Sequence, residues 1–150
     1  MNEIAERVVR LLEESARQAR VALRLENVEK LPPVSMSETD VEQLFFALLG
    51  NAIEAADGTR ARKVVLSGAV NDKRIELRFS DECGGIAPEN IDRIFEPFFT
   101  TKPRGQGTGL GLCIVHDAVT RAGGHIRLES EFGRGTTFFV TLPVHEERAQ

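Results

Sequence analysis

The sequence predicts an α+β fold, a two-layer sandwich in which a mixed sheet of about five strands carries about three helices on one face. Apolar residues recur at helical spacing in separated segments, and they alternate at strand spacing in the segments between and after them. The expected order is helix, strand, helix, two strands, a short helix, a long loop, a helix and two strands. The chain has 150 residues, 41% hydrophobic and 28% charged, which suits a single domain over 1–150.

The N-terminal half contains two expected helices and three expected strands. A helix is expected over 4–19, with one apolar face made of Ile4, Val8, Leu11, Leu12, Ser15 and Ala19. Alternation over 21–25 predicts a half-buried strand, and 63–70 and 74–80 read as a hairpin. Between them, Ser37 and Asp40 have capping-box spacing. They open a helix from about Glu38 to Ala56, whose apolar face is Val41, Leu44, Phe45, Leu48 and Ala52.

The C-terminal half is richer in glycine. The stretch from 80 to 111 is glycine-rich and contains a short helix around Ile91 and Ile94. A third helix is expected over about 110–122, where Gly123-Gly124 ends it. Two last strands flank a turn at 133–135 and are marked by Ile126, Leu128, Phe138, Val140 and Leu142. The core should span about 3–144, with a polar tail over 145–150.

Composition and charge exclude several classes of function. The net charge is −4 and no basic block occurs, which argues against a nucleic-acid partner. No apolar run is long enough to span a membrane, so we expect no membrane contact and a cytoplasmic location, although a parent protein could be anchored by another segment. The two cysteines, Cys83 and Cys113, lack metal-ligand spacing and are expected to be thiols.

Two segments place polar groups where a ligand could use them. Asn51 lies on a helix whose other face is apolar, although a mid-helix Asn is more often simply solvated. Asp81 ends a strand pattern and precedes Gly84-Gly85-Ile86. Such an acid can accept a hydrogen bond from a ligand amine while the backbone approaches the ligand's ring. A turn closed by the Asp side chain is about equally probable for this segment alone.

Two further segments are rich in glycine. Gly107, Gly109 and Gly111 lie at a helix start, where exposed N–H groups and the helix dipole favour an anion such as a triphosphate. A flexible linker is the alternative, which the apolar pair Leu110 and Leu112 argues against. The spacing fits neither the dinucleotide fingerprint nor a Gly-Lys-Ser/Thr loop. The segment 133–138, with Thr136, could be an ordinary hairpin turn.

Taken together and in this order, these segments resemble the sequence boxes of the histidine-kinase catalytic domain, whose superfamily includes gyrase, mismatch-repair ATPases and a heat-shock chaperone. The similarity covers nearly the whole chain, and its strongest part is the Phe-Glu-Pro-Phe-Phe-Thr-Thr-Lys string that begins at Phe95. The resemblance implies a Bergerat-type ATP-binding fold, ATP and Mg²⁺ as cofactors, and protein-histidine kinase activity. The acceptor histidine would lie on a separate dimerisation domain, absent from this chain along with any sensor domain.

The resemblance also implies roles for particular residues. Asn51 would bind Mg²⁺ through its amide oxygen, and with Lys102 it would form the catalytic pair. Asp81 would accept from the adenine amino group and Thr136 would hold a water beside it. Phe98 and Phe99 would anchor a lid that includes the segment from about Thr100 to Thr108, expected to be mobile without nucleotide. The remaining contacts to ATP would come from Ala55, Gly85, Ile86, Gly107, Thr108, Gly109, Leu110 and Gly111.

Two departures from the family pattern bear on function. Cys83 stands where the family has the first glycine after the aspartate, so a Cβ intrudes near the expected pocket, where ATP should shield its thiol. Cys113 is expected to be buried on the third helix. Ala47 stands one turn before Asn51, where hydrolysing relatives carry a water-activating glutamate, so little hydrolysis is expected. His116 lacks the rest of an acceptor motif.

The expected partners are the parent protein's own dimerisation and phosphoacceptor domain and, through it, a response regulator. The isolated domain should be monomeric and the full kinase a homodimer. One alternative is a serine kinase of the anti-sigma-factor type, which shares the nucleotide site. Another is a degenerate nucleotide-binding regulatory module, which Cys83 keeps open.

Overall fold

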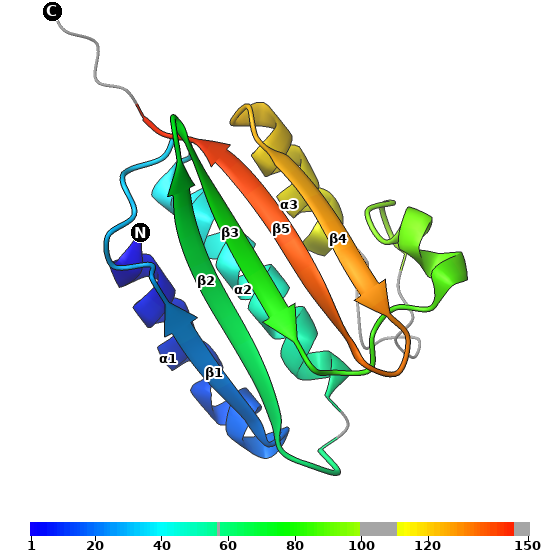
Figure 1. The fold of residues 1–150 in the computed structure, drawn as a ribbon. Coiled ribbons are helices and arrows are strands. Elements are labelled where there is room, and N and C mark those ends of the chain that lie inside the picture. The colour runs from blue at the N-terminus through cyan, green and yellow to red at the C-terminus, as the bar shows by residue number, and fades with distance from the viewer. Residues whose placement is uncertain (57, 100–110, 146–150) are drawn as a thin grey trace, which may run out of the picture.

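The computed structural model describes residues 1–56, 58–99 and 111–145, and confirms the expected α/β sandwich. Three α-helices lie on one face of a five-stranded sheet, whose strand order is β1-β2-β3-β5-β4 (Figure 1). The pair β1–β2 is parallel and the other pairs are antiparallel. The elements are α1 (Asn2–Gln18), β1 (Val21–Glu26), α2 (Glu38–Ala55), β2 (Arg62–Asn71), β3 (Arg74–Asp81), the 3₁₀ helix η1 (Pro88–Arg93), α3 (Gly111–Arg121), β4 (His125–Glu131) and β5 (Gly135–Pro143).

Helix α2 lies behind the middle of the sheet and supplies more buried core residues than any other described element (Figure 1). The N–H of Asp40 donates to Ser37 Oγ at 3.1 Å, which confirms the expected N-terminal cap. All the side chains expected on its apolar face are buried, together with Leu49 and Ile53. They pack against alternate residues of the strands, among them Leu66, Ile75, Leu77, Phe79, Val140 and Leu142. The burial of this face of α2 against the sheet thus follows from the apolar periodicity.

The apolar face of α1 differs from the sequence prediction in one respect. The buried residues are Ile4, Ala5, Val8, Leu12 and Ala16. Leu11 is 61% exposed and Ser15 is also exposed, so both were wrongly placed on the inner face. The buried stripe follows the i, i+4 row from Ile4 through Val8 and Leu12, and Leu11 lies one position off that row. None of the described helices is long and apolar enough to cross a membrane.

The sheet face away from the helices is polar, with one large ring upon it. Phe139 lies in register with Arg78 of β3 and Arg127 of β4. The guanidinium carbons lie 5.3 Å and 3.9 Å from the ring centroid, so both cations cover the aromatic face. Phe139 is consequently only 8% exposed although no helix covers it. The two arginine side chains thus cover the apolar ring, so that it does not form an exposed hydrophobic patch on the open face.

The expected ends of α3 and of the β2–β3 hairpin are confirmed, with small shifts. Gly123 has φ of 81°, and the N–H of Gly124 donates to the carbonyl oxygen of Val119 at 2.9 Å, as in a glycine-terminated helix. The strands were expected to end at 70 and to resume at 74, but β2 continues to Asn71, which pairs with Arg74, so Asp72 and Lys73 form the turn, with Asp72 at φ 57°. The short helix expected around Ile91 and Ile94 is the 3₁₀ helix η1.

We predict that Gly124→Ala destabilises the fold while Gly50→Ala does not. A Cβ on Gly124 would overlap the carbonyl oxygen of Thr141 and lie 2.9 Å from Leu142 Cδ2, whereas a Cβ on Gly50, inside α2, would meet nothing within 4 Å. Overpacking of this kind costs about 1–3 kcal/mol. Helix propensity should instead raise the stability of Gly50→Ala by about 0.5–1 kcal/mol. Urea unfolding of both variants measures the difference, and equal midpoints would contradict the packing at Gly124.

Candidate functional site

Asp81 ends β3 with its side chain on the face that the helices cover. Strand alternation places it there, because Ile75, Leu77 and Phe79 of the same strand are buried against the helices. Its Oδ1 accepts hydrogen bonds from the N–H of Cys83 at 2.9 Å and from the N–H of Thr136 at 3.3 Å. Within the described parts of the chain, Oδ2 accepts none. One carboxylate oxygen is therefore fixed by the backbone, and the other has no hydrogen-bond partner among the described residues.

Two hydroxyl groups lie beside Asp81 on neighbouring strands. Thr136 is opposite Asp81 in the β3–β5 register and opposite Ser130 in the β4–β5 register. The Ser130 and Thr136 hydroxyl oxygens are 2.9 Å apart. Ser130 Oγ also accepts from the N–H of Ile86 at 2.7 Å and donates to the carbonyl oxygen of Gly135 at 3.2 Å. Ser130 thus connects β4 with the loop that follows β3.

That loop lies against the β4–β5 turn so closely that two positions require glycine. A Cβ on Gly85, where φ is 69°, would overlap the carbonyl oxygen of Glu131. A Cβ on Gly135 would overlap the carbonyl oxygen of Asp81. The N–H of Gly133 donates to the carbonyl oxygen of Gly84 at 2.7 Å, which adds a direct bond between the two segments. The expected close approach at Gly85 is thus made by the protein's own backbone.

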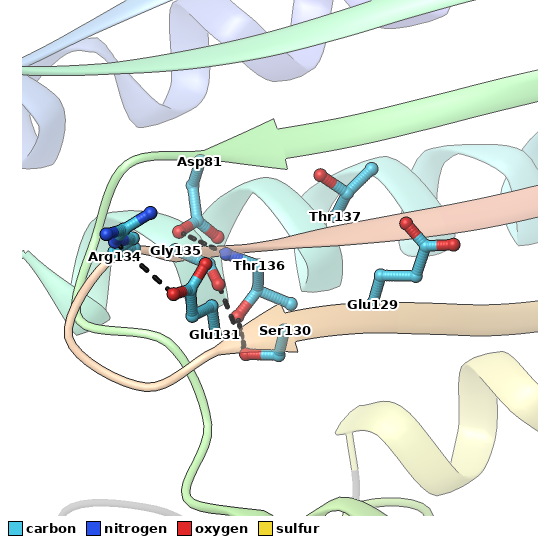
Figure 2. A pocket seen from close by; sticks show the side chains of 8 residues that line it. All are labelled: Asp81, Glu129, Ser130, Glu131, Arg134, Gly135, Thr136 and Thr137. Atoms are coloured by element: carbon cyan, nitrogen blue, oxygen red, sulfur yellow. Dashed lines mark hydrogen bonds and ion pairs between the residues drawn. The ribbon is translucent and has the colours of Figure 1, made fainter.

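Figure 2 shows a hollow at this end of the sheet and the side chains that surround it. Its lining residues are Asp81, Glu129, Ser130, Glu131, Arg134, Gly135, Thr136 and Thr137. Alternation assigns Glu129 and Thr137 to the open face of the sheet, and Ser130 and Thr136 to the face that the helices cover. Because the hollow takes in residues of both faces, the hydrogen bonds to Asp81 and Ser130 mark the candidate site better than the hollow does.

Burial sets the electrostatics of the site. It raises the pKa of Asp81 from 3.8 to about 6, and the hydrogen bonds from Cys83 and Thr136 offset only part of this rise. Burial also raises the pKa of the Cys83 thiol to about 11, with the Asp81 charge as the next cause. The thiol is therefore neutral at physiological pH and a poor nucleophile.

The two cysteines are placed differently from the sequence expectation. Cys83 is 1% exposed and belongs to the hydrophobic core, and it is not among the residues that line the hollow. Cys113, expected to be buried, is partly exposed on α3. The expectation that ATP would shield an accessible Cys83 thiol is therefore not supported. Strand and helix periodicity could not foresee this, because Cys83 lies in an irregular loop beyond β3.

The structure brings the last turn of α2 to the same loop. A Cβ on Gly84 would lie 3.7 Å from the carbonyl oxygen of Ala55, so the loop approaches the end of the helix. Asn51 lies one turn earlier on the same side of α2 and is partly exposed. No cluster of His, Cys, Asp or Glu that could hold a metal occurs in 1–56, 58–99 and 111–145. A single amide oxygen suits Mg²⁺, which keeps several waters and takes substrate phosphate oxygens.

Other expected site residues are only partly placed. Lys102, Gly107, Thr108, Gly109 and Leu110 lie outside the described residues, as does the expected lid segment 100–108. Gly111 is exposed at the first position of α3.

The two lid phenylalanines differ from each other. Phe98 has φ of 67° and is 74% exposed, so its ring is not held by burial. Phe99 is partly buried, and the Arg93 guanidinium carbon lies 4.7 Å from its ring centroid. Of the expected anchoring pair, Phe99 is therefore the one that packs.

Sequence reasoning missed Ser130 and Gly135 as site residues. Ser130 sits at an inward position of β4, as a polar residue in line with Ile126 and Leu128. The sequence does place a serine at an inward position near the end of a strand. Because buried polar groups need hydrogen-bond partners, this could have identified Ser130 as a site residue.

His116 is not presented as a phosphoacceptor. It lies within α3, partly buried, with its ring centroid 5.1 Å from that of Phe95. The ring therefore packs as part of the apolar layer between α3 and the segment after η1.

Comparison with known proteins agrees with this geometry. Residues 36–146 match the family described as histidine kinase-, DNA gyrase B-, and HSP90-like ATPase. Sporulation kinase E of Bacillus subtilis (strain 168) is 33% identical over 97% of this chain and 19% of its own length. Sensor histidine kinase ZraS of Escherichia coli (strain K12) is 31% identical over 99% of this chain and 31% of its own. The chain thus spans less than a third of these two relatives.

Solved structures give the same result. The catalytic domain of histidine kinase ThkA has a TM-score of 0.80 at 29% identity, covering 95% of this chain and 91% of that one. Full-length ShkA in complex with AMPPNP has a TM-score of 0.80 at 26% identity, covering 97% of this chain and 30% of that one. The chain belongs to the histidine kinase-, DNA gyrase B-, and HSP90-like ATPase family, and within it has the form of the ATP-binding catalytic domain of a sensor histidine kinase.

Proposed function

We propose that the chain holds Mg-ATP and transfers its γ-phosphoryl group to a histidine on a separate dimerisation domain of a two-component kinase. The observation that carries the proposal is the Asp81 carboxylate, held on one oxygen by backbone N–H groups and without a hydrogen bond on the other among the described residues. An amino group such as that of adenine supplies the donor that this oxygen lacks. The complex of the similar ShkA with AMPPNP supports a nucleotide as the ligand.

The raised pKa of Asp81 favours a binding role over a structural one. Hydrogen bonds accepted from backbone N–H groups stabilise a carboxylate and by themselves lower its pKa. Here burial outweighs the bonds from Cys83 and Thr136. The protein's own groups therefore leave the ionised side chain destabilised, and a ligand donor would relieve this cost.

Asn51 is proposed as the protein ligand of Mg²⁺, and Lys102 as a cation that meets the phosphates. Bound Mg²⁺ would supply charge neutralisation at the phosphate oxygens. The chain's own contribution is to hold the base at Asp81, while Ala55 and Gly84 bring α2 next to the loop. Gly85 and Ile86 would line the base, and the glycine segment ending at Gly111 would bind phosphate through backbone N–H groups.

The nucleophile is proposed to come from another domain. Phosphoryl transfer needs an in-line nucleophile as well as charge stabilisation. Ala47 has no group that could activate water, and it lies partly buried in α2. The ring of His116 is packed on Phe95. The proposed partners are the parent protein's acceptor domain, which would dimerise, and the response regulator that receives the phosphate.

The burial of Cys83 bears on the alternative of a degenerate regulatory module. Its Cβ was the ground for that alternative, and its side chain lies in the core instead of the hollow. No feature of the described residues favours the serine-kinase alternative, and the relatives named above are called sporulation kinase and sensor histidine kinase. Transfer to histidine is therefore the function we put to the test.

The first prediction separates reading of the base from binding of the metal. Asp81→Asn should weaken ADP and ATP about tenfold or more with or without Mg²⁺, because a charge-assisted hydrogen bond is lost. Asn51→Ala should mainly abolish the gain in affinity that Mg²⁺ brings. Calorimetry in both conditions tests this, with Asp72→Asn in the distant β2–β3 turn and Gln43→Ala on α2 as matched controls. Identical losses for both site variants in both conditions would contradict the assignment.

The second prediction concerns stability against pH without nucleotide. The folded pKa of Asp81, about 6, exceeds its ordinary 3.8, so the fold binds this proton more tightly than the unfolded chain does. Its stabilising contribution is present below pH 3.8 and is lost as the pH rises through about 6. The stability of wild type minus that of Asp81→Asn should therefore fall by about 2 kcal/mol between about pH 4 and pH 7.5. A pH-independent difference in denaturant unfolding would instead indicate a purely structural aspartate.

The third prediction concerns the reaction. The chain alone should bind ATP and scarcely hydrolyse it. Mixed with the two-helix acceptor domain of its own parent protein and labelled ATP, it should place phosphate on that domain only, stable to base and labile to acid. Asn51→Ala should remove the transfer, and Gln43→Ala should keep it. Labelling of the isolated chain at His116, or rapid hydrolysis without the acceptor, would overturn the mechanism.

A further inference from the structure

Ser130 occupies a position that the proposed nucleotide chemistry does not use. Its Oγ is within hydrogen-bond distance of three groups: the N–H of Ile86 at 2.7 Å, the hydroxyl of Thr136 at 2.9 Å and the carbonyl oxygen of Gly135 at 3.2 Å. A serine hydroxyl has one proton to donate and two lone pairs with which to accept. Three contacts therefore use its whole capacity.

Counting donors assigns the direction of each bond. The N–H of Ile86 can only donate and the carbonyl oxygen of Gly135 can only accept. The single proton of Ser130 therefore goes to Gly135, and the remaining lone pair must accept from Thr136. No other arrangement satisfies all three contacts at once. Thr136 is 6% exposed, so an unsatisfied hydroxyl proton there would be costly.

This direction determines what Thr136 can offer a ligand. With its proton committed to Ser130, Thr136 Oγ1 has only lone pairs left and acts as an acceptor. Asp81, opposite it in the register, is also an acceptor when ionised. Both groups at this corner therefore demand hydrogen-bond donors from a ligand or from a water that the ligand holds.

We propose that Ser130 is a positioning residue that fixes the Thr136 hydroxyl as an acceptor and so makes the site prefer a purine with a 6-amino group over one with a 6-oxo group. The inference rests on the proposed function, in which Asp81 accepts from the purine base and Thr136 lies beside it. A 6-oxo oxygen brings lone pairs against two acceptors, whereas a 6-amino group brings protons. Selectivity of this kind comes from leaving polar groups unpaired in the wrong complex.

Removing the Ser130 hydroxyl should reduce the preference for a 6-amino purine, because it frees the Thr136 hydroxyl to rotate. In Ser130→Ala the Thr136 proton loses its acceptor, and the hydroxyl is free to turn and donate to a 6-oxo group. The N–H of Ile86 also loses its acceptor, which loosens the loop and weakens all nucleotides alike. The ratio of the Kd for IDP to the Kd for ADP separates the two effects, because the loosened loop cancels in the ratio.

The experiment is calorimetric titration of the purified chain with ADP and with IDP at about pH 8, where Asp81 is ionised because its pKa is about 6. Wild type should prefer ADP. Ser130→Ala should lower the IDP/ADP ratio about threefold to tenfold, the worth of one hydrogen bond. Ser130→Thr, which keeps the hydroxyl, should retain the wild-type IDP/ADP ratio.

Ser80 supplies a matched control. Its hydroxyl lies 3.0 Å from that of Thr137, a second Ser–Thr pair across neighbouring strands, but on the open face of the sheet. Ser80→Ala should leave the ratio unchanged. In a Thr136→Val background, Ser130→Ala should not change the ratio further, because the Thr136 hydroxyl through which Ser130 acts has been removed.

The outcomes distinguish this inference from the proposed function. If Asp81→Asn binds ADP as tightly as wild type does, the base is read elsewhere and both fail. If Asp81→Asn weakens ADP but a folded Ser130→Ala keeps the wild-type ratio, only the role of Ser130 is overturned. An undiminished effect of Ser130→Ala in the Thr136→Val background would also overturn it, since Ser130 would then act by another route. Should Ser130→Ala not fold, the ratio for Ser130→Thr decides, and a loss there refutes the proposal.

Discussion

The close contact between the loop after β3 and the β4–β5 turn is the constraint on which the site depends. Gly85 and Gly135 permit it, because at both positions a Cβ would overlap a backbone carbonyl oxygen. The contact brings the N–H of Ile86 to Ser130, while the pairing of β3 with β5 brings the N–H of Thr136 to Asp81. Without the contact Ser130 would lose the N–H of Ile86, and the hydroxyl pair would lose its fixed orientation. At these two positions glycine is needed first because two backbone segments approach each other closely, and access for a ligand is a secondary reason.

The same contact explains why the ionised form of Asp81 is destabilised by burial. Packing the loop against the turn removes water from the carboxylate, and two N–H donors do not fully replace that water. The core beneath the sheet is built from α2 and alternate strand residues, and it holds the carboxylate in place at this cost. Functional sites commonly combine such local instability with a well-packed scaffold.

Periodicity in the sequence was enough to predict the layers, the hairpin, the apolar face of α2 and the end of α3, because each depends on spacing along a regular element. The end of a strand pattern followed by glycines drew attention to Asp81, whereas the role of Thr136 came from the resemblance to the histidine-kinase catalytic domain. Periodicity misplaced Leu11, because the buried row of α1 runs through Leu12, the next residue. It could not orient Cys83 or find the contacts of Ser130, since these arise where two distant loops meet and no local pattern encodes their separation.

Cys83 shows why a site built largely from backbone groups tolerates a changed side chain. What this position gives Asp81 is an N–H, and every residue except proline carries one. The backbone at Cys83 does not have a positive φ, whereas Gly84 and Gly85 have φ of 46° and 69°. A glycine at position 83 is therefore not demanded by the backbone here, and the cysteine side chain fills the core. The next two positions have no such freedom, because a Cβ at either would be strained by the backbone conformation and at Gly85 would also overlap Glu131. The geometry of the Asp81 carboxylate thus depends on which backbone amides reach it, and the identity of a loop residue matters only where a Cβ would block that approach.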